Sequence, residues 1–302
     1  MSREHPDTAG PTTTTDQRHE RIVPDRVGVL GGGRMGAGIA HAFLLAGAQV
    51  TVVERDGPAA QAAKERIERD LAKSLERGAV DGNLDEWAEN LTVSLGIADF
   101  APCELVVEAV PEVWDLKVVA LQEVEAHLAA TAWLATNTSS LSVDGLAAQL
   151  ARPERFCGLH FFNPVPASKL VEVVIGEHTG EQLKDLSVRW VQGLGKTPVV
   201  VADAPGFASS RLGVVIALEA IRMVEDGVAS AADIDAAMVL GYKHPVGPLA
   251  LTDIVGLDVR LGIAEYLAAE LGERFEPPRL MREMVARGDL GRKSGKGFYD
   301  YG

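Results

Sequence analysis

Residues 26–54 read RVGVLGGGRMGAGIAHAFLLAGAQVTVVE, and this stretch decides the fold. An apolar strand leads into a glycine cluster, an apolar-periodic helix runs as far as Gly47, and a second apolar strand follows. This order is typical of a βαβ unit. Gly31, Gly33 and Gly36 match G-x-G-x-x-G, in which the first glycine permits a tight turn, the second lets backbone approach a pyrophosphate, and the third allows close helix packing. The stretch therefore predicts a dinucleotide-binding turn.

The residues around this turn predict which dinucleotide binds. The helix N-terminus offers free N–H groups to phosphates, and Glu54 ends the second strand, where a carboxylate accepts hydrogen bonds from both adenosine ribose hydroxyls. A carboxylate there repels a 2′-phosphate, so the sequence favours NAD over NADP, although Arg55 partly softens that preference. A glycine-rich turn in some other α/β protein is the alternative. The predicted cofactor contacts of the turn are Gly31, Gly32, Gly33, Arg34, Met35 and Gly36.

Further strands at 104–109 and 132–136, separated by a helical pattern, predict an α/β Rossmann-like, doubly wound and mostly parallel sheet. Ligands bind beyond the carboxyl ends of such strands. Polar side chains follow both strands, in residues 112–117 and 137–140. Ordinary helix capping is an alternative explanation for residues 137–140.

Residues 155–174 read RFCGLHFFNPVPASKLVEVV and predict two strands joined by a Pro-containing turn. A hairpin-like return about residue 166 would bring His160 and Glu172 together. A histidine backed by a carboxylate is a poised general base, because the carboxylate fixes the tautomer and stabilises the imidazolium. The alternatives are a structural histidine and a solvated glutamate, but hydride removal from an alcohol carbon needs such a base.

The pattern after Pro205 is helical, with an apolar stripe over 214–223, a capping box at Ser230 and Asp233, and apolar stretches at 249–271 and 279–287. The sequence therefore predicts three parts. Residues 1–24 are a disordered N-terminal extension, 25–203 form an NAD-binding Rossmann domain that carries the His/Glu pair, and 204–302 form an all-helical substrate and dimerisation domain.

Composition excludes several classes of protein. The 302 residues carry a formal net charge of −14, whereas a duplex nucleic acid or an anionic membrane surface requires a basic footprint. No apolar run approaches the ~18 residues of a membrane span. Cys103 and Cys157 are too few for a disulfide framework and lack metal-ligand spacing. We expect a cytoplasmic protein with no nucleic-acid or membrane partner and no metal site.

Seven motifs carry a resemblance to a known family, and together they span residues 26 to 301. They are GGGRMGAGIA (31–40), VVEAVPE (106–112), NTSSLS (137–142), GLHFFNPVPASKLVEVV (158–174), APGF (204–207), HPVGPLALTDIVGLD (244–258) and GRKSGKGFYDY (291–301). The chain resembles L-3-hydroxyacyl-CoA dehydrogenases, most closely the short-chain 3-hydroxybutyryl-CoA dehydrogenase type.

The resemblance implies roles for individual residues. His160 would be the general base and Glu172 its partner, while Ser139 would hydrogen-bond the substrate's 3-oxygen beside the nicotinamide. Ser210 stands where the family often has an asparagine beside the reacting oxygen, and Asp70 stands where a hydroxyl residue is usual. The other implied contacts are Glu54, Glu112, Lys117, Asn137 and Lys293 for the cofactor, and Asn163 and Arg77 (with Asp70) for the acyl-CoA.

The function that this resemblance implies is reversible NAD-dependent oxidation of a (3S)-3-hydroxyacyl-CoA, of the 3-hydroxybutyryl-CoA type, to the 3-oxoacyl-CoA by a homodimer. Two alternatives stay open. One is a related dehydrogenase that acts on a carrier-protein-bound hydroxyacyl group or another hydroxy acid. The other is a non-catalytic dinucleotide-binding protein.

Overall fold

The computed structural model describes residues 22–302, so most of the predicted N-terminal extension lies outside the described residues. The prediction is wrong for residues 22–24. Val23 packs into the core of the first domain, and Pro24 is buried beside it. The folded domain therefore begins a few residues before the first strand.

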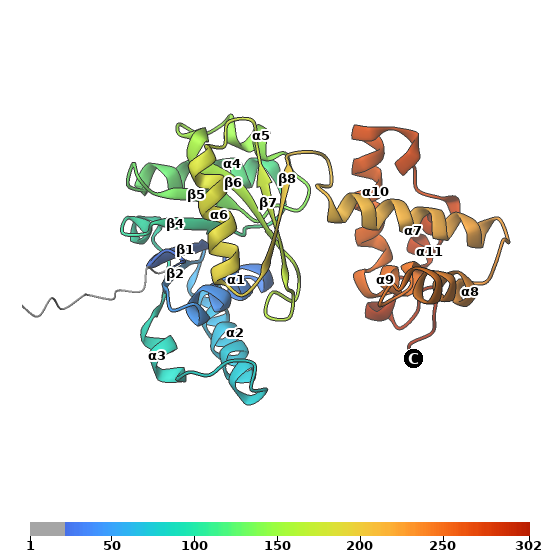
Figure 1. Cartoon of the computed structure of the whole chain (residues 1–302), viewed down its shortest axis with the longest axis horizontal. Helices are drawn as coiled ribbons and strands as arrows, with labels where there is room; N and C mark the ends of the chain where they lie inside the picture. The colour runs from blue at the N-terminus through green and yellow to red at the C-terminus, as the bar shows by residue number, and fades with distance from the viewer. Residues whose placement is uncertain (1–21) are drawn as a thin grey trace, which may run out of the picture.

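An eight-stranded sheet forms the first domain, in the order β3-β2-β1-β4-β5-β6-β7-β8 (Figure 1). Its neighbouring strands are parallel except for β6 and β7, which pair antiparallel through the predicted hairpin. The fold prediction of a doubly wound, mostly parallel sheet is confirmed. The strands are β1 (Arg26–Leu30), β2 (Gln49–Val53), β3 (Leu91–Ser94), β4 (Leu105–Glu108), β5 (Trp133–Thr136), β6 (Phe156–Phe161), β7 (Leu170–Ile175) and β8 (Thr197–Ala202).

Helices cover both faces of this sheet. Apolar side chains of α1, α2 and α6 pack in one core cluster, and those of α4 and α5 pack in a second cluster. Leu116 and Val119 of α4 are exposed, whereas Leu121 and Val124 of the same helix are buried. The helices are α1 (Arg34–Leu45), α2 (Gly57–Glu76), α3 (Leu84–Glu89), α4 (Trp114–His127), α5 (Val143–Ala147) and α6 (Glu181–Gly193).

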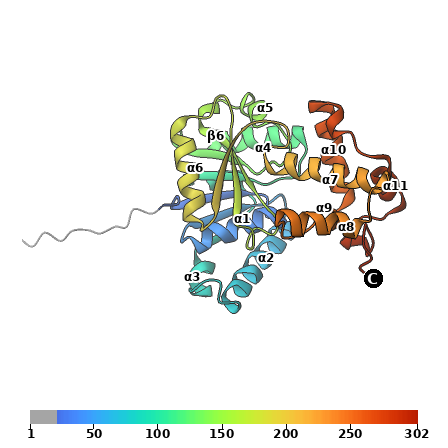
Figure 2. The same ribbon diagram turned by 45° about the vertical axis from the view of Figure 1, so that its right-hand side comes forward.

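A second, helical domain follows β8 and lies beside the sheet (Figures 1 and 2). Its helices are α7 (Ser209–Glu225), α8 (Ala231–Ala236), α9 (Pro248–Val255), α10 (Leu257–Leu271) and α11 (Arg279–Arg287), and they share a third apolar core. Ser230 caps α8, since its hydroxyl accepts a hydrogen bond from Asp233 N at 3.2 Å, and the Asp233 carboxylate accepts from that hydroxyl at 2.6 Å rather than from the Ser230 backbone as in a full capping box. The apolar stretch 249–271 is not one helix, because Gly256 adopts φ +106° and separates α9 from α10.

None of the helices in residues 22–302 combines the length and the hydropathy that a membrane span requires.

Candidate active site

The glycine turn between β1 and α1 has the geometry that a dinucleotide needs. Gly31 adopts φ +88°, which favours glycine, and its N–H donates to Val53 O at 2.8 Å. A Cβ on Gly36 would lie 1.7 Å from Gly31 O, so α1 can approach the turn only with glycine there. A Cβ on Gly33 would meet nothing within 4 Å. The exposed side of the turn is therefore open to a pyrophosphate.

Glu54 and Arg66 both hydrogen-bond to the backbone of Gly32 in this turn, one to its N–H and the other to its carbonyl oxygen. The Glu54 carboxylate accepts from Gly32 N at 2.7 Å, and Arg66 of α2 donates from Nη1 to Gly32 O at 2.7 Å. Glu54 thus stands at the end of β2, where an adenosine ribose would bind. Sequence reasoning missed Arg66, although α2 carries it one helical turn before Asp70. The open turn, the helix N-terminus and this carboxylate fit a nicotinamide dinucleotide.

The antiparallel register of β6 and β7 places His160 opposite Glu172, as the hairpin predicted. His160 Nδ1 lies 2.8 Å from Glu172 Oε2, and the two residues are only 6% and 1% exposed. The rings of Phe162 and Phe207 flank the imidazole at centroid distances of 4.4 and 5.7 Å. An ionised Glu172 makes Nδ1 the protonated nitrogen, which leaves Nε2 as the basic one.

Glu172 also anchors the start of the helical domain. Its Oε1 accepts from Ala208 N at 3.1 Å and from Ser209 N at 2.7 Å, and its Oε2 accepts from the Ser209 hydroxyl at 2.9 Å. Burial raises the pKa of the Glu172 carboxyl, but hydrogen bonds from His160 and Ser209 outweigh burial and hold the pKa below its ordinary value. Sequence reasoning missed Ser209 and singled out the adjacent Ser210, because no local pattern shows which hydroxyl faces β7.

Glu112 organises the loop that follows β5. Its Oε1 accepts from the Thr138 hydroxyl at 2.6 Å, from Ser139 N at 2.8 Å and from Ser140 N at 3.0 Å. Burial raises the pKa of Glu112, but the charge of Lys117 and these hydrogen bonds outweigh burial. The pKa of Glu112 is therefore lower than its ordinary value. The carboxylate therefore stays ionised and fixes the loop that carries the exposed Ser139.

Lys117, which the resemblance implies as a cofactor contact, is buried, and its charge faces two carboxylates. It is 1% exposed, and its Nζ lies 2.7 Å from Glu108 Oε1 and 3.3 Å from Glu112 Oε2. A buried ammonium needs carboxylate partners to offset its lost hydration. Lys117 is thus the counter-ion of two carboxylates, those of Glu108 and Glu112, near the carboxyl end of β4.

Further predicted residues lie at four places in the fold: the loop after β5, the β6–β7 turn, α2 and the first turn of α7. The Asn137 side chain accepts from Phe161 N at 2.8 Å and so ties the loop after β5 to β6, while Asn163 is exposed in the β6–β7 turn. Asp70 lies on α2, and Arg77 is exposed at its C-terminal cap. Ser210 is in the first turn of α7.

Lys293 lies within the helical domain, where its Nζ lies 2.6 Å from Asp258 Oδ2. The structure does not bring it to the glycine turn, and its predicted cofactor contact stays a prediction.

The sheet carries both a dinucleotide turn and an imidazole backed by a carboxylate at the carboxyl ends of its strands. This combination is typical of nicotinamide-dependent alcohol dehydrogenases. Two family models match the chain: "3-hydroxyacyl-CoA dehydrogenase, NAD binding domain" over residues 26–204 and "3-hydroxyacyl-CoA dehydrogenase, C-terminal domain" over residues 206–301. The chain belongs to the 3-hydroxyacyl-CoA dehydrogenase family.

Similar proteins span nearly the whole chain. A 3-hydroxybutyryl-CoA dehydrogenase of Mycobacterium tuberculosis is 41% identical over 280 residues, which are 91% of this chain and 98% of the relative. A probable 3-hydroxybutyryl-CoA dehydrogenase of Deinococcus radiodurans is 39% identical over 91% of this chain and 100% of its own length. The crystal structure of (S)-3-hydroxybutyryl-CoA dehydrogenase PaaH1 from Ralstonia eutropha superposes with a TM-score of 0.88 at 37% identity, covering 92% of this chain and 99% of that one.

Proposed function

We propose that the chain catalyses the reversible NAD-dependent oxidation of a short-chain (3S)-3-hydroxyacyl-CoA, such as 3-hydroxybutyryl-CoA, to the 3-oxoacyl-CoA. The observation that carries this proposal is the buried His160–Glu172 pair, 2.8 Å apart, on the same sheet as an open dinucleotide turn. Family membership and the names of the relatives support the acyl-CoA substrate.

The residues perform the acid–base half of the reaction. His160 Nε2 accepts the proton of the 3-hydroxyl while the C3–H bond breaks, and the lone pair left on oxygen forms the C=O bond of the product. Glu172 stabilises the resulting imidazolium, and the hydroxyl of Ser139 donates to the 3-oxygen. When bound, the nicotinamide supplies the acceptor for the hydride from C3. In the reverse direction His160 returns its proton to the oxygen.

The test of this function is a set of three substrates compared at equal concentration. NADH oxidation is followed by absorbance with acetoacetyl-CoA, with a longer 3-oxoacyl-CoA and with an acyl-carrier-protein thioester. The proposal expects the highest kcat/KM with acetoacetyl-CoA. Preference for the carrier thioester would favour the carrier-protein alternative, and NADH binding without turnover of any of the three would favour a non-catalytic binding protein.

We propose NAD as the cofactor, because the Glu54 carboxylate stands where it would repel a 2′-phosphate. Arg66 and Arg55 next to this carboxylate supply positive charge that limits the discrimination. The ratio of kcat/KM with NADH to that with NADPH should exceed one, and Glu54→Gln should lower the ratio. A ratio below one in the unaltered enzyme would contradict the proposal.

We further propose that the chain forms a homodimer through its helical domain. Large apolar side chains are exposed on three of its helices: Leu212 and Ile216 on α7, Leu251, Ile254 and Val255 on α9, and Val259 on α10. Isolated apolar residues are ordinary on a surface, but a concentration of this kind is typical of an interface. Sedimentation velocity should show a dimer that Leu212→Lys weakens and Val228→Lys, outside these helices, does not. A monomer at all concentrations would contradict this proposal.

A further inference from the structure

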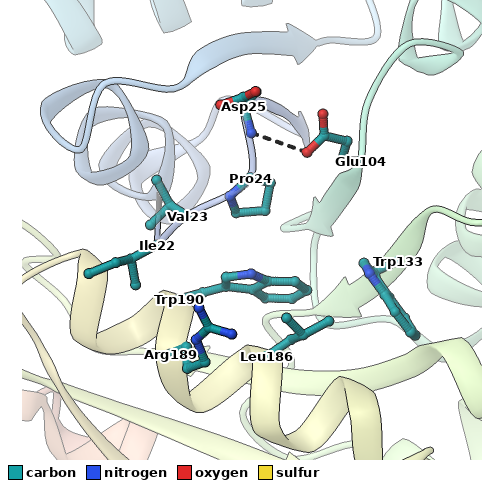
Figure 3. A pocket seen from close by; sticks show the side chains of 9 residues that line it. All are labelled: Ile22, Val23, Pro24, Asp25, Glu104, Trp133, Leu186, Arg189 and Trp190. Atoms are coloured by element: carbon teal, nitrogen blue, oxygen red, sulfur yellow. Dashed lines mark hydrogen bonds between the residues drawn. The ribbon is translucent and has the colours of Figure 1, made fainter. Parts of the chain in front are cut away.

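Residues 22–302 contain three buried side-chain atoms without a hydrogen-bond partner: His41 Nδ1, Asp258 Oδ1 and Arg260 Nε. The other ring nitrogen of His41 bonds to the Ser74 hydroxyl at 2.9 Å, and Asp258 faces Lys293. The guanidinium of Arg260 has no hydrogen bond or ion pair with any described residue. None of the residues that line the pocket of Figure 3, at the amino ends of β1, β4 and β5, carries such an atom. Arg260 is therefore the described residue whose partner has to come from elsewhere.

Arg260 lies in the first turn of α10, which packs across the first half of α7 (Figure 1). It is buried, and a Cβ on Gly213 of α7 would lie 2.9 Å from its Nη1. The guanidinium therefore lies against the backbone of α7, at a point where a larger residue would displace it. A glycine inside a helix costs about 0.5–1 kcal/mol relative to alanine, and a buried charge without a partner costs more. Two features that lower stability thus coincide, which is typical of a functional site.

This point on α7 lies one helical turn from the candidate active site. The N–H and the hydroxyl of Ser209 donate to Glu172, and Gly213 follows Ser209 by four residues. Ser210, whose predicted contact is the reacting oxygen, precedes Gly213 by three residues. Residues three and four apart share one face of a helix, so the guanidinium lies on the face that meets the His160–Glu172 pair, about 5 Å farther along the axis. Gly213 is only half-buried, so the acyl chain of a substrate held at His160 can reach it.

No carboxylate of the described residues serves as the counter-ion of Arg260. Burial lowers the pKa of its guanidinium, and no acid opposes this effect. A second copy of the chain, docked through the exposed apolar side chains of residues 212–216 and 251–259, would bring no free acid to it. These segments contain two acids, of which Asp253 is buried and hydrogen-bonded to the chain end and Asp258 is paired with Lys293. The observations therefore favour an anion that arrives with the substrate.

We propose that Arg260 binds a carboxylate at the far end of the acyl chain, so that the enzyme prefers 3-hydroxyacyl-CoA substrates derived from dicarboxylic acids. This inference rests on the proposed dehydrogenase function and narrows its substrate class. Guanidinium and carboxylate form a bidentate, charge-assisted pair, which is stronger where water is excluded. A methyl group at the same place would leave the buried guanidinium unpaired. Because the pair forms away from the reacting carbon, it acts on KM rather than on kcat.

Two substrates of equal length test the proposal in the direction of NADH oxidation. They are 3-oxoadipyl-CoA and 3-oxohexanoyl-CoA, which differ only in whether C6 is a carboxylate or a methyl group. The ratio of their kcat/KM values should favour the diacid by about tenfold or more, the effect of one charge-assisted hydrogen bond. The difference should appear mainly in KM.

Variants of the helical domain locate the contact. Arg260→Met should lower this ratio by about a hundredfold, because the carboxylate loses its partner, and should raise kcat/KM for 3-oxohexanoyl-CoA, because its apolar end then meets an apolar side chain. Arg274→Met, which removes a positive charge from an exposed position of the same domain, should keep the ratio of the unaltered chain. The Tm of the free Arg260→Met variant should rise, since replacing an unpaired buried charge by an apolar side chain removes its desolvation cost.

Four results would overturn the proposal: equal kcat/KM for the two substrates, an unchanged ratio in Arg260→Met, a lower Tm of that variant, or its weaker self-association in sedimentation velocity. The last result would assign the guanidinium to a second copy of the chain. Turnover of 3-oxohexanoyl-CoA and acetoacetyl-CoA without preference for the diacid would refute this inference alone. No turnover of any of these thioesters with NADH would refute the proposed function as well.

Discussion

Both domains bury carboxylates, but for different purposes. In the sheet domain Glu172 shares its oxygens between the backbone of α7 and a titratable ring, that of His160. In the helical domain Asp253, also 1% exposed, accepts from Phe298 N, Tyr299 N and the Tyr301 hydroxyl at 3.0 Å each. The partners of Asp253 all belong to the chain's own C-terminus. What makes a buried carboxylate chemically useful is therefore a partner that can gain a proton, not burial itself.

A second buried carboxylate of the helical domain, Asp235, is also structural. Asp235 accepts from Leu249 N at 2.8 Å and from the Tyr299 hydroxyl at 2.7 Å, so it joins α8, α9 and the chain end. Burial, together with the hydrogen bond to Asp235, raises the pKa of Tyr299 and keeps this hydroxyl a donor. Asp235 and Asp253 thus form a clamp that holds the C-terminal segment on α9. This clamp accounts for the motifs HPVGPLALTDIVGLD and GRKSGKGFYDY.

The largest effect is expected from His160→Gln. Glutamine keeps a polar group of similar reach but cannot take the hydroxyl proton, so kcat should fall by about 10²–10⁴, a typical general-base effect. Steady-state NADH oxidation with acetoacetyl-CoA measures it. His178→Gln, at an exposed position, is the matched control. Near-normal turnover by the His160→Gln variant would remove His160 from the reaction.

Glu172→Gln should lower kcat by about 10², less than loss of the imidazole itself, because the base remains but loses its orienting charge. The KM for acetoacetyl-CoA should change little, since Glu172 touches His160 and α7 rather than substrate. Exposed Glu177→Gln is the control. A variant with normal kcat and reduced stability would place Glu172 with Asp253 among purely structural carboxylates.

Asp253→Asn should give the opposite result to Glu172→Gln. Its amide nitrogen would face one of the donors from the chain end, so the free energy of unfolding should fall by about 2 kcal/mol, the cost of unmade buried hydrogen bonds. The kcat per folded molecule should stay within about twofold. Urea unfolding and active-site titration separate the two quantities, with exposed Asp226→Asn as control. A selective loss of kcat would show that the clamp also acts in the reaction.

The sequence predicted the parts of this molecule that local pattern determines. The sheet and the approach of His160 to Glu172 could be predicted from three local patterns: G-x-G-x-x-G, the alternation of strands with helices, and the Pro-containing turn. It did not predict β3 and β8, the two edge strands, which are short or largely exposed and so lack a clear apolar signal. Nor could it predict the burial of Lys117 on α4, because that burial depends on an ion pair with Glu108 at the end of β4.

The lowered pKa of Glu112 gives a smaller effect that depends on pH. A carboxyl whose pKa is lower in the folded state adds stability above its unfolded pKa of about 4.3, and this stability is lost as pH falls through the folded value. Between pH 5 and about pH 3 the unaltered chain should therefore lose unfolding free energy more steeply than Glu112→Gln. Urea unfolding across this range measures the slope, and exposed Glu219→Gln should follow the unaltered chain. Parallel slopes for Glu112→Gln would contradict the assigned ionisation.

The smallest effects distinguish the two adjacent hydroxyls at the start of α7. Ser209→Ala removes one hydrogen bond to Glu172, worth about 1 kcal/mol, so kcat should fall about fivefold with KM unchanged. Ser210→Ala tests the implied contact with the reacting oxygen and should lower kcat/KM for acetoacetyl-CoA by a similar factor. If Ser210→Ala leaves kcat/KM unchanged, Ser210 has no contact with substrate. Ser209, which positions the carboxylate behind His160, would then be the hydroxyl through which α7 influences the reaction.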